Sequence, residues 1–170
     1  MGTNQLIKLL TPTFTLIELS ALSGKWVGID ASVWLHQFCY RHAKSVVRGN
    51  YTPVIEALSK RACDLTALGI ILYFVFENRK VVAKAKTDKQ RAVKRAKAWA
   101  DIQGHDSEGE IEVSQKVLQA LVSVTPELVT QAIAAVRRLG IHYVVAPGEA
   151  DSQLVYFSRV AKNNGQPFIY

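Results

Sequence analysis

Three apolar segments of this sequence each lead into acidic residues. The segments cover residues 26–29, 70–76 and 141–145, and the acids that follow them are Asp30, Glu77, Glu149 and Asp151. If the segments are parallel strands of one sheet, their carboxyl ends meet at a single edge, where such sheets bind ligands. Carboxylates gathered at one edge repel one another and need a positive charge nearby. Mg²⁺ prefers carboxylate and water oxygens, so the pattern predicts a metal site made by these acids.

The same acids also have a structural interpretation. An Asp or Glu directly after a strand often lies at the amino end of the next helix, where it accepts hydrogen bonds from free amides and interacts favourably with the helix dipole. Taken singly, Asp30, Glu149 and Asp151 fit this capping role better than metal binding. The recurrence of an acid after each strand favours a functional site, because such groups gather at functional sites.

One segment carries the whole positive excess of the chain. Residues 79–97 hold nine Lys and Arg residues against one acid, Asp88, whereas the net charge of the 170-residue chain is +7. On a helix that starts near Lys80, one stripe would carry Lys80, Lys84, Arg91 and Arg95. Positive charge concentrated just after an acid-ending strand predicts a polyanionic partner, most simply nucleic acid. A solvated, charged surface helix is the alternative.

The elements that must position these residues alternate along the chain. The three apolar segments are short and rich in β-branched or aromatic residues, which is typical of strands covered on both faces. Helical patterns cover residues 31–47, 52–68, 126–139 and 151–162. Thr125 and Pro126 form a clear helix start, and a fourth strand begins at Phe168. The alternation predicts an α/β fold with a mostly parallel sheet flanked by helices.

Composition narrows the class of protein further. With 49% apolar residues the chain is not disordered by composition, and its longest apolar run is too short to span a bilayer, so we expect no membrane partner. Cys39 and Cys63 form no C-x-x-C pair and are expected to be reduced structural thiols in an intracellular protein. The histidines show no metal-ligand spacing, and His142, in an apolar strand, is expected to be a core histidine.

Two longer motifs resemble a known family. The stretch GKWVGIDASVWLHQF, residues 24–38, resembles the first strand and helix of the 5′-nuclease superfamily that contains flap endonucleases and exonuclease 1. The stretch APGEADSQLVYF, residues 146–157, resembles its second signature in the exonuclease 1 form, and MGTNQLIKLL, residues 1–10, is similar to its N-terminal segment. The resemblance implies a PIN-like, 5′-nuclease fold with an N-terminal nuclease region at 1–100, a variable linker and helix at 101–124, and the start of an internal nuclease region at 125–170.

This resemblance also implies an activity. Members of the family are structure-specific nucleases that cleave DNA near a free 5′ end or 5′ flap with two Mg²⁺ ions, in repair or replication, and a nuclear location is expected. Three residues match metal-site carboxylates of the family: Asp30, Glu149 and Asp151. Glu77 matches the acid that ends the family's second strand. The residues that match the catalytic pair of the family are Lys84 and Arg91. The residues expected to contact DNA are Gly2, His36, Lys80 and Arg95.

Two departures from the family pattern leave a rival interpretation open. Glu77-Asn78 stands where the family usually has Asp-Gly, and a ligand moved by about 1 Å can cost around 10²-fold in rate. The family's later carboxylates lie beyond the strand that starts at Phe168, so we expect a truncated domain with an incomplete second metal site and little or no activity alone. The rival is a catalytically eroded member of the same fold that acts as a nucleic-acid or protein interaction module, for example in RNA regulation.

Overall fold

The computed structural model describes residues 11–13, 16–77, 93, 96, 115–165 and 168–170. In chain order the elements are η1 (Thr11–Thr13), η2 (Leu19–Leu22), β1 (Trp26–Asp30), α2 (Ala31–Arg41), α3 (Ala43–Val47), α4 (Thr52–Ala67), β2 (Ile71–Glu77), α6 (Gln115–Leu121), α7 (Pro126–Arg138), β3 (His142–Ala146), α8 (Ala150–Asn163) and β4 (Phe168–Ile169). All three predicted strands and the start of the fourth are present, each within one residue of its expected position.

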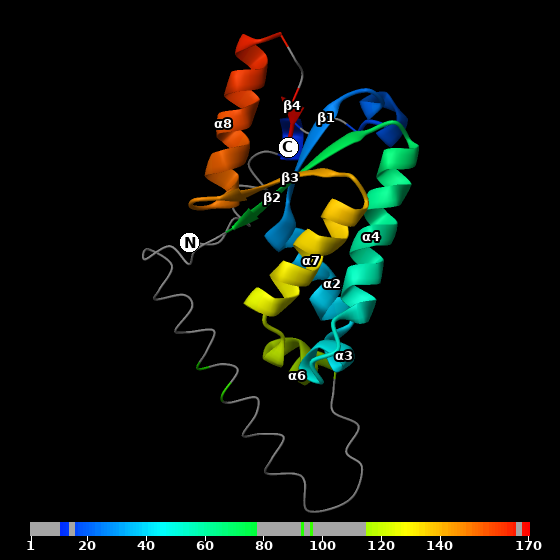
Figure 1. Ribbon diagram of the computed structural model, residues 1–170, viewed down its shortest axis with the longest axis vertical. Coiled ribbons are helices and arrows are strands. Elements are labelled where there is room, and N and C mark those ends of the chain that lie inside the picture. The colour runs from blue at the N-terminus through cyan, green and yellow to red at the C-terminus, as the bar shows by residue number, and fades with distance from the viewer. Residues whose placement is uncertain (1–10, 14–15, 78–92, 94–95, 97–114, 166–167) are drawn as a thin grey trace, which may run out of the picture.

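The strands of the described residues form one parallel sheet in the order β3-β2-β1-β4. Figure 1 shows α8 on one side of this sheet and α2, α4 and α7 on the other. The predicted α/β fold with flanking helices is therefore confirmed. No helix in the described ranges is long and apolar enough to cross a membrane.

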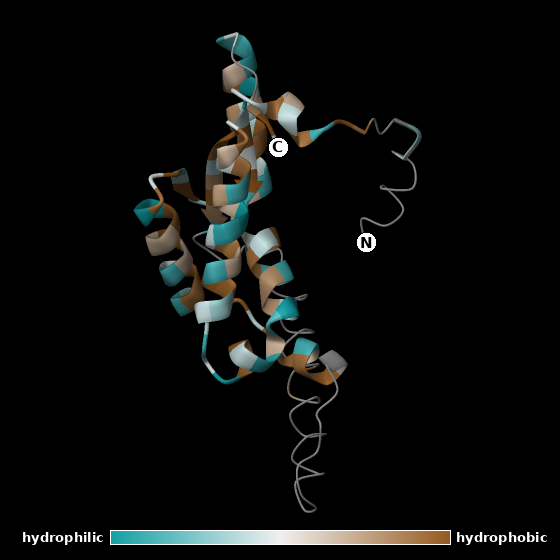
Figure 2. Cartoon of the chain, turned by 90° about the vertical axis from the view of Figure 1, so that its right-hand side faces the viewer, coloured by the Kyte–Doolittle hydropathy of each residue, from teal (hydrophilic) through white to brown (hydrophobic). Residues whose placement is uncertain are grey.

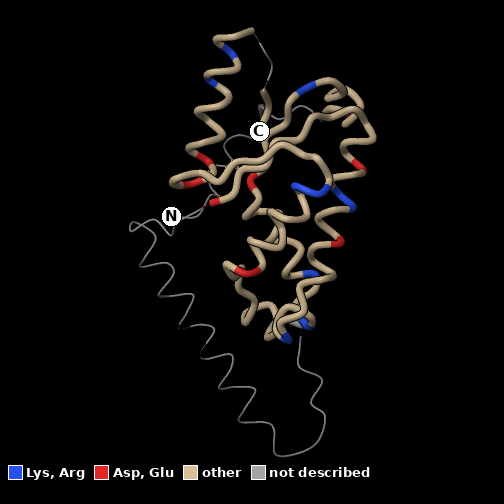
Figure 3. Tube along the Cα trace, viewed as in Figure 1, with Lys and Arg blue, Asp and Glu red and all other residues tan. Residues whose placement is uncertain are grey.

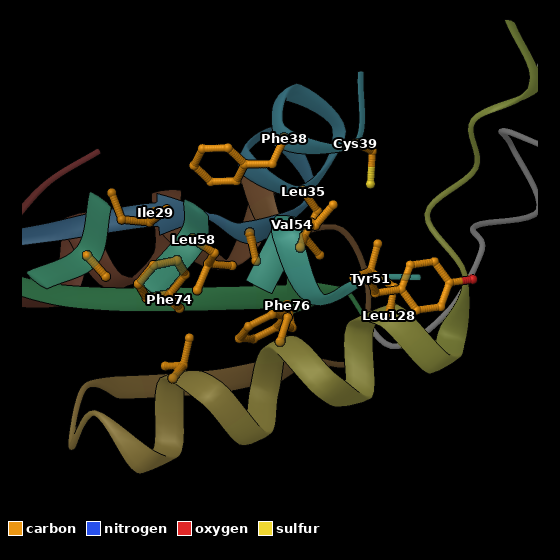
Figure 4. Close-up of a cluster of buried hydrophobic side chains, with 14 of the residues drawn as sticks. Ile29, Leu35, Phe38, Cys39, Tyr51, Val54, Leu58, Phe74, Phe76 and Leu128 are labelled. Atoms are coloured by element: carbon orange, nitrogen blue, oxygen red, sulfur yellow. The ribbon is translucent and has the colours of Figure 1, made fainter. Parts of the chain in front are cut away.

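The larger core fills the space between the sheet and the α2–α4–α7 layer. Alternate residues of β2, Phe74 and Phe76, point into it because side chains alternate between the two faces of a strand. Figure 4 shows these rings meeting the helix residues Leu35, Phe38, Val54, Leu58 and Leu128. The helices carry polar and apolar residues together, whereas the strands are mostly apolar (Figure 2). This contrast is expected for a sheet covered on both faces by amphipathic helices.

The opposite face of the sheet is covered by α8 in a smaller cluster. Its buried members are Val75, Ala146, Ala150 and Leu154. Gly28 in β1 is essential to this contact, since a Cβ atom there would lie 2.5 Å from Leu154 Cδ2 and 2.7 Å from the Phe168 ring. The missing side chain allows both α8 and β4 to approach β1 closely.

The helix predictions are correct in position but wrong in one detail. Residues 31–47 form two helices, because His42 leaves the helical region with ψ of 32°, and α3 packs against α6. The start of α7 is confirmed: Thr125 Oγ1 accepts a hydrogen bond of 3.2 Å from the Leu128 amide, and Pro126 occupies the first turn. That helix ends before Gly140, whose φ of 68° is readily adopted by glycine.

Candidate functional site

The sheet register brings the predicted acids to one edge. Asp30, the last residue of β1, pairs with Val75, and Glu77, the last residue of β2, pairs with Ala146 of β3. Glu149 and Asp151 follow at the start of α8. Figure 3 shows acidic positions (red) gathered where β1 and β2 end and α8 begins. The prediction that these acids share the carboxyl edge of a parallel sheet is confirmed at the level of the backbone.

Asp30 caps the helix that follows it. Its Oδ1 atom accepts hydrogen bonds from the amides of Ser32, at 2.7 Å, and Val33, at 3.3 Å. These two amides have no partner inside the helix, so the carboxylate satisfies them and meets the positive end of the helix dipole. The second oxygen, Oδ2, takes no part in this cap.

Glu77 interacts with a different helix. Its Oε1 atom lies 3.5 Å from the amide nitrogen of Ala150, the first residue of α8. The contact joins residues that are 73 apart in the chain and ties the tip of β2 to the amino end of α8. A carboxylate at a helix amino end is electrostatically favourable, so Glu77 contributes to the position of α8.

Glu149 and Asp151 flank that same helix start. Glu149 occupies the N-cap position with an extended backbone, but its side chain does not accept a capping hydrogen bond. Asp151 is exposed in the first turn. The capping interpretation therefore holds for Asp30 and not for Glu149.

The acids at the edge suit a divalent cation by chemistry. All are carboxylates, the ligand type that Mg²⁺ prefers. However, no group of three or more His, Cys, Asp or Glu side chains within the described ranges is placed so that it could hold a metal ion. A metal that bound here would need these side chains to move toward a common point.

Several predicted site residues lie outside the described residues. They are Gly2, Lys80, Lys84, Arg91 and Arg95. Their proposed roles remain predictions.

His36 lies on α2, between the sheet edge and α3. Its ring centroid is 6.1 Å from that of Tyr40, one helical turn further, and Tyr40 is exposed. Arg61 of α4 lies beside the same helix, with its guanidinium carbon 5.1 Å from the centre of the Trp34 ring. Sequence reasoning missed the contact of Tyr40 with His36 and the contact of Arg61 with α2. The four-residue spacing of His36 and Tyr40 could have indicated the first, whereas no local signal links Arg61 to α2.

Two further expectations can be compared with the structure. Cys39 and Cys63 are both free thiols, as predicted, and burial raises the pKa of Cys39 from 9.0 to about 11. The expectation that His142 is a core histidine is wrong. His142 is exposed on β3, where its ring stacks on Tyr73 at 6.2 Å and lies 5.0 Å from the Trp26 ring. β3 is an edge strand of this sheet, so apolar neighbours in the sequence do not bury it.

Known proteins resemble this chain over nearly its whole length. Exodeoxyribonuclease 1 of Schizosaccharomyces pombe is 33% identical over 162 residues, which is 94% of this chain and 28% of that protein. Flap endonuclease 1 of Theileria annulata is 34% identical over 154 residues, covering 86% of this chain and 30% of its own length. The chain thus spans between a quarter and a third of the length of these relatives.

Solved structures support the same grouping. The catalytic core of Rad2 in complex with a DNA substrate matches 88% of this chain and 37% of its own, with a TM-score of 0.56 and 26% identity. Human GEN1 in complex with Holliday junction DNA shares the fold, with a TM-score of 0.59 and 21% identity over 95% of this chain and 34% of its own. The family model of the XPG N-terminal domain matches residues 1–98, more than half of the chain. Together with the acid-bearing edge of the parallel sheet, these matches show that the chain belongs to the XPG N-terminal family, within the 5′-nuclease superfamily of flap endonucleases and exonuclease 1.

Proposed function

We propose that this chain is the N-terminal part of a structure-specific nuclease that cleaves DNA phosphodiesters near a free 5′ end or 5′ flap. The observation that carries the proposal is the convergence of Asp30, Glu77 and the start of α8 at one sheet edge, in a chain whose relatives are named as exonucleases and flap endonucleases. The nucleus is the compartment where we expect such a DNA substrate.

The carboxylates at the edge would hold divalent metal, with Asp30, Glu77, Glu149 and Asp151 as the candidate ligands. Two bound Mg²⁺ ions would supply a reactive hydroxide and stabilise the leaving oxygen. Asp30 is the best prepared ligand, because its helix cap fixes the carboxylate while leaving Oδ2 uncommitted to the cap. Glu77 would join it while its Oε1 atom stays close to the Ala150 amide, because that contact uses only one of its two carboxylate oxygens.

The basic segment would supply the phosphate contacts. Lys84 and Arg91 would offset the charge that develops on the scissile phosphate, while Lys80, Arg95, Gly2 and His36 would contact the DNA around it. Contacts of this kind read the shape and backbone of DNA rather than its base sequence. We therefore expect the chain to bind DNA with a 5′ flap more tightly than blunt duplex DNA, with little dependence on base sequence.

A non-catalytic binding module is the second candidate. Two observations favour it: Glu77 is engaged with the Ala150 amide, and the described side chains form no group of three ligands. Such a module would bind nucleic acid and leave it intact, whereas an enzyme would cleave it.

A paired binding and cleavage experiment separates the two candidates. Binding of a fluorescent 5′-flap duplex is measured by anisotropy in EDTA, and cleavage is measured at excess protein with Mg²⁺. Because no three-ligand group is preformed among the described side chains, we expect cleavage by this chain to be slow, so long single-turnover incubations are needed.

The key variants are Asp30→Asn and Asp64→Asn. The second makes the same chemical change at an exposed acid on α4, where Asp64 pairs only with Lys60 among the described residues. Mg²⁺-dependent cleavage that is lost in Asp30→Asn and kept in Asp64→Asn supports the enzyme. Flap binding without any cleavage supports the module. Equal affinity for flap and blunt duplex refutes the preference for 5′ ends that we propose for the nuclease.

A further inference from the structure

Arg61 holds α2 through contacts that are unusual for a surface arginine. Its guanidinium carbon lies 5.1 Å from the centre of the Trp34 ring and 4.8 Å from that of Phe38. Its Nη1 atom also donates a hydrogen bond of 3.1 Å to Gln37 Oε1. All three partners belong to α2, whereas Arg61 belongs to α4. In the described part of the chain this guanidinium forms no salt bridge, so its charge is directed at two ring faces and an amide.

These contacts link α4 to side chains of α2 that rest on the sheet. Trp34 packs edge-on against Phe74 of β2, with ring centroids 5.3 Å apart and an angle of 89° between the planes. Arg61 therefore covers a ring that itself rests on β2, one of the two inner strands of the sheet. Loss of the Arg61 contacts would remove one restraint on α2 while the buried residues of α2 stay in the core.

The helix held in this way carries functional groups of the proposed site. Asp30 caps its amino end at the sheet edge, and His36 and Tyr40 lie along it. A helix with its side chains has a radius of about 5–6 Å, so a rotation of about 10° moves a side-chain tip by roughly 1 Å. Displacements of that size are enough to weaken the alignment of a substrate strongly.

We propose that Arg61 is a positioning residue, which orients α2 so that Asp30 and the His36–Tyr40 pair meet the DNA backbone correctly. The proposal rests on the proposed function, because it assumes that the side of α2 that carries His36 and Tyr40 meets DNA. Arginine suits the role better than lysine: its planar guanidinium can lie against two rings while donating to Gln37, whereas an ammonium group is a point charge without a flat face.

The test compares Arg61→Met, Arg61→Lys and Lys60→Met. Lys60 is the adjacent residue on α4, with its side chain 77% exposed and paired with Asp64, so Lys60→Met is a matched loss of one cation. Affinity for the fluorescent 5′-flap duplex is measured in EDTA over a range of salt concentrations. The temperature is set where circular dichroism shows every variant to be fully folded.

A positioning role predicts that Arg61→Met and Arg61→Lys both weaken binding, by roughly three- to tenfold, since cation–π contacts of this kind are moderate in strength. The slope of log Kd against log salt stays that of the parent chain, and Lys60→Met binds normally. The proposal is overturned if Arg61→Lys binds like the parent chain while Arg61→Met lowers the slope by about one, because that pattern indicates a direct phosphate contact.

A second measurement does not depend on DNA. Hydrogen exchange of α2 amides should be faster in Arg61→Met and Arg61→Lys than in Lys60→Met, because the helix has lost a contact that holds it on α4. Equal exchange in all three variants overturns the positioning role. If the parent chain fails to bind any DNA, the proposed function fails, while the exchange result still decides whether Arg61 holds α2.

Discussion

Gly28 offers the sharpest test of how the sheet and α8 fit together, and we predict that Gly28→Ala destabilises the fold. The added Cβ would lie 2.5 Å from Leu154 Cδ2 and 2.7 Å from Cε1 of Phe168. Contacts this short force neighbours to move, and Leu154 is only 3% exposed and has little room to do so. The residue lies two positions before Asp30, so the shift would reach the candidate site.

The expected magnitude follows from these contacts. Overpacking of a well-packed core by one methyl group costs about 1–3 kcal/mol. The alanine also reduces the entropy of the unfolded chain, which returns about 0.4–1 kcal/mol at an unstrained position. We therefore expect a net loss of about 1–2 kcal/mol, equivalent to a fall in Tm of roughly 2–8 °C for a chain of this length.

Gly148→Ala is the matched control. No heavy atom lies within 4 Å of a Cβ built on Gly148, and its φ is not positive, so the same substitution should be neutral or slightly stabilising. Urea unfolding followed by circular dichroism measures both variants. The double variant Gly28→Ala/Leu154→Ala should lose less stability than the sum of the single variants, because removal of the Leu154 methyls relieves the main clash.

Either of two results would refute this reasoning. One is a Gly28→Ala protein as stable as Gly148→Ala, which would mean that α8 and β4 do not lie as close to β1 as described. The other is strict additivity in the double variant, which would mean that Leu154 is not the residue displaced.

The remaining predictions concern caps and thiols. Asp30→Ala should lose about 1 kcal/mol of stability because both capping hydrogen bonds disappear, whereas Asp30→Asn should keep most of that stability. Asp30→Asn should nevertheless bind Mn²⁺ more weakly in a titration calorimeter. If Asp30→Ala is as stable as the parent chain, the cap is excluded. Thr125→Ala should lose about 1–2 kcal/mol in urea unfolding, while Thr130→Ala, later on the same helix, should be nearly neutral. Burial raises the pKa of the Cys39 thiol from 9.0 to about 11. Between these two pH values the unfolded chain releases the Cys39 proton while the folded chain keeps it, so the free energy of unfolding should fall as pH rises from about 9 toward 11. At pH 8 iodoacetamide should label exposed Cys63 and spare Cys39, as mass spectrometry can show.

Elements with local signals were predictable from the sequence. The run of β-branched and aromatic residues defines β2, and Thr125-Pro126 defines the start of α7, because propensity and capping act over only a few residues. The shared edge of Asp30 and Glu77 was also predictable, since parallel strands all end on one side of a sheet. The break at His42 was not, because no glycine or proline marks it in the sequence.

The sequence by itself therefore determined which residues end the strands and where charge is concentrated, because strand propensity, helix capping and the positions of charged residues are properties of short segments. Only the tertiary structure decided what each acid touches. It alone shows that Asp30 caps its own helix while Glu77 reaches the amide of Ala150, 73 residues away. It alone places Arg61 over two rings of another helix. The contacts of Glu77 and Arg61 join separate elements of the chain, so they depend on how the helices pack on the sheet. The cap by Asp30 is local, and there the structure decided only between capping and the alternatives that the sequence left open.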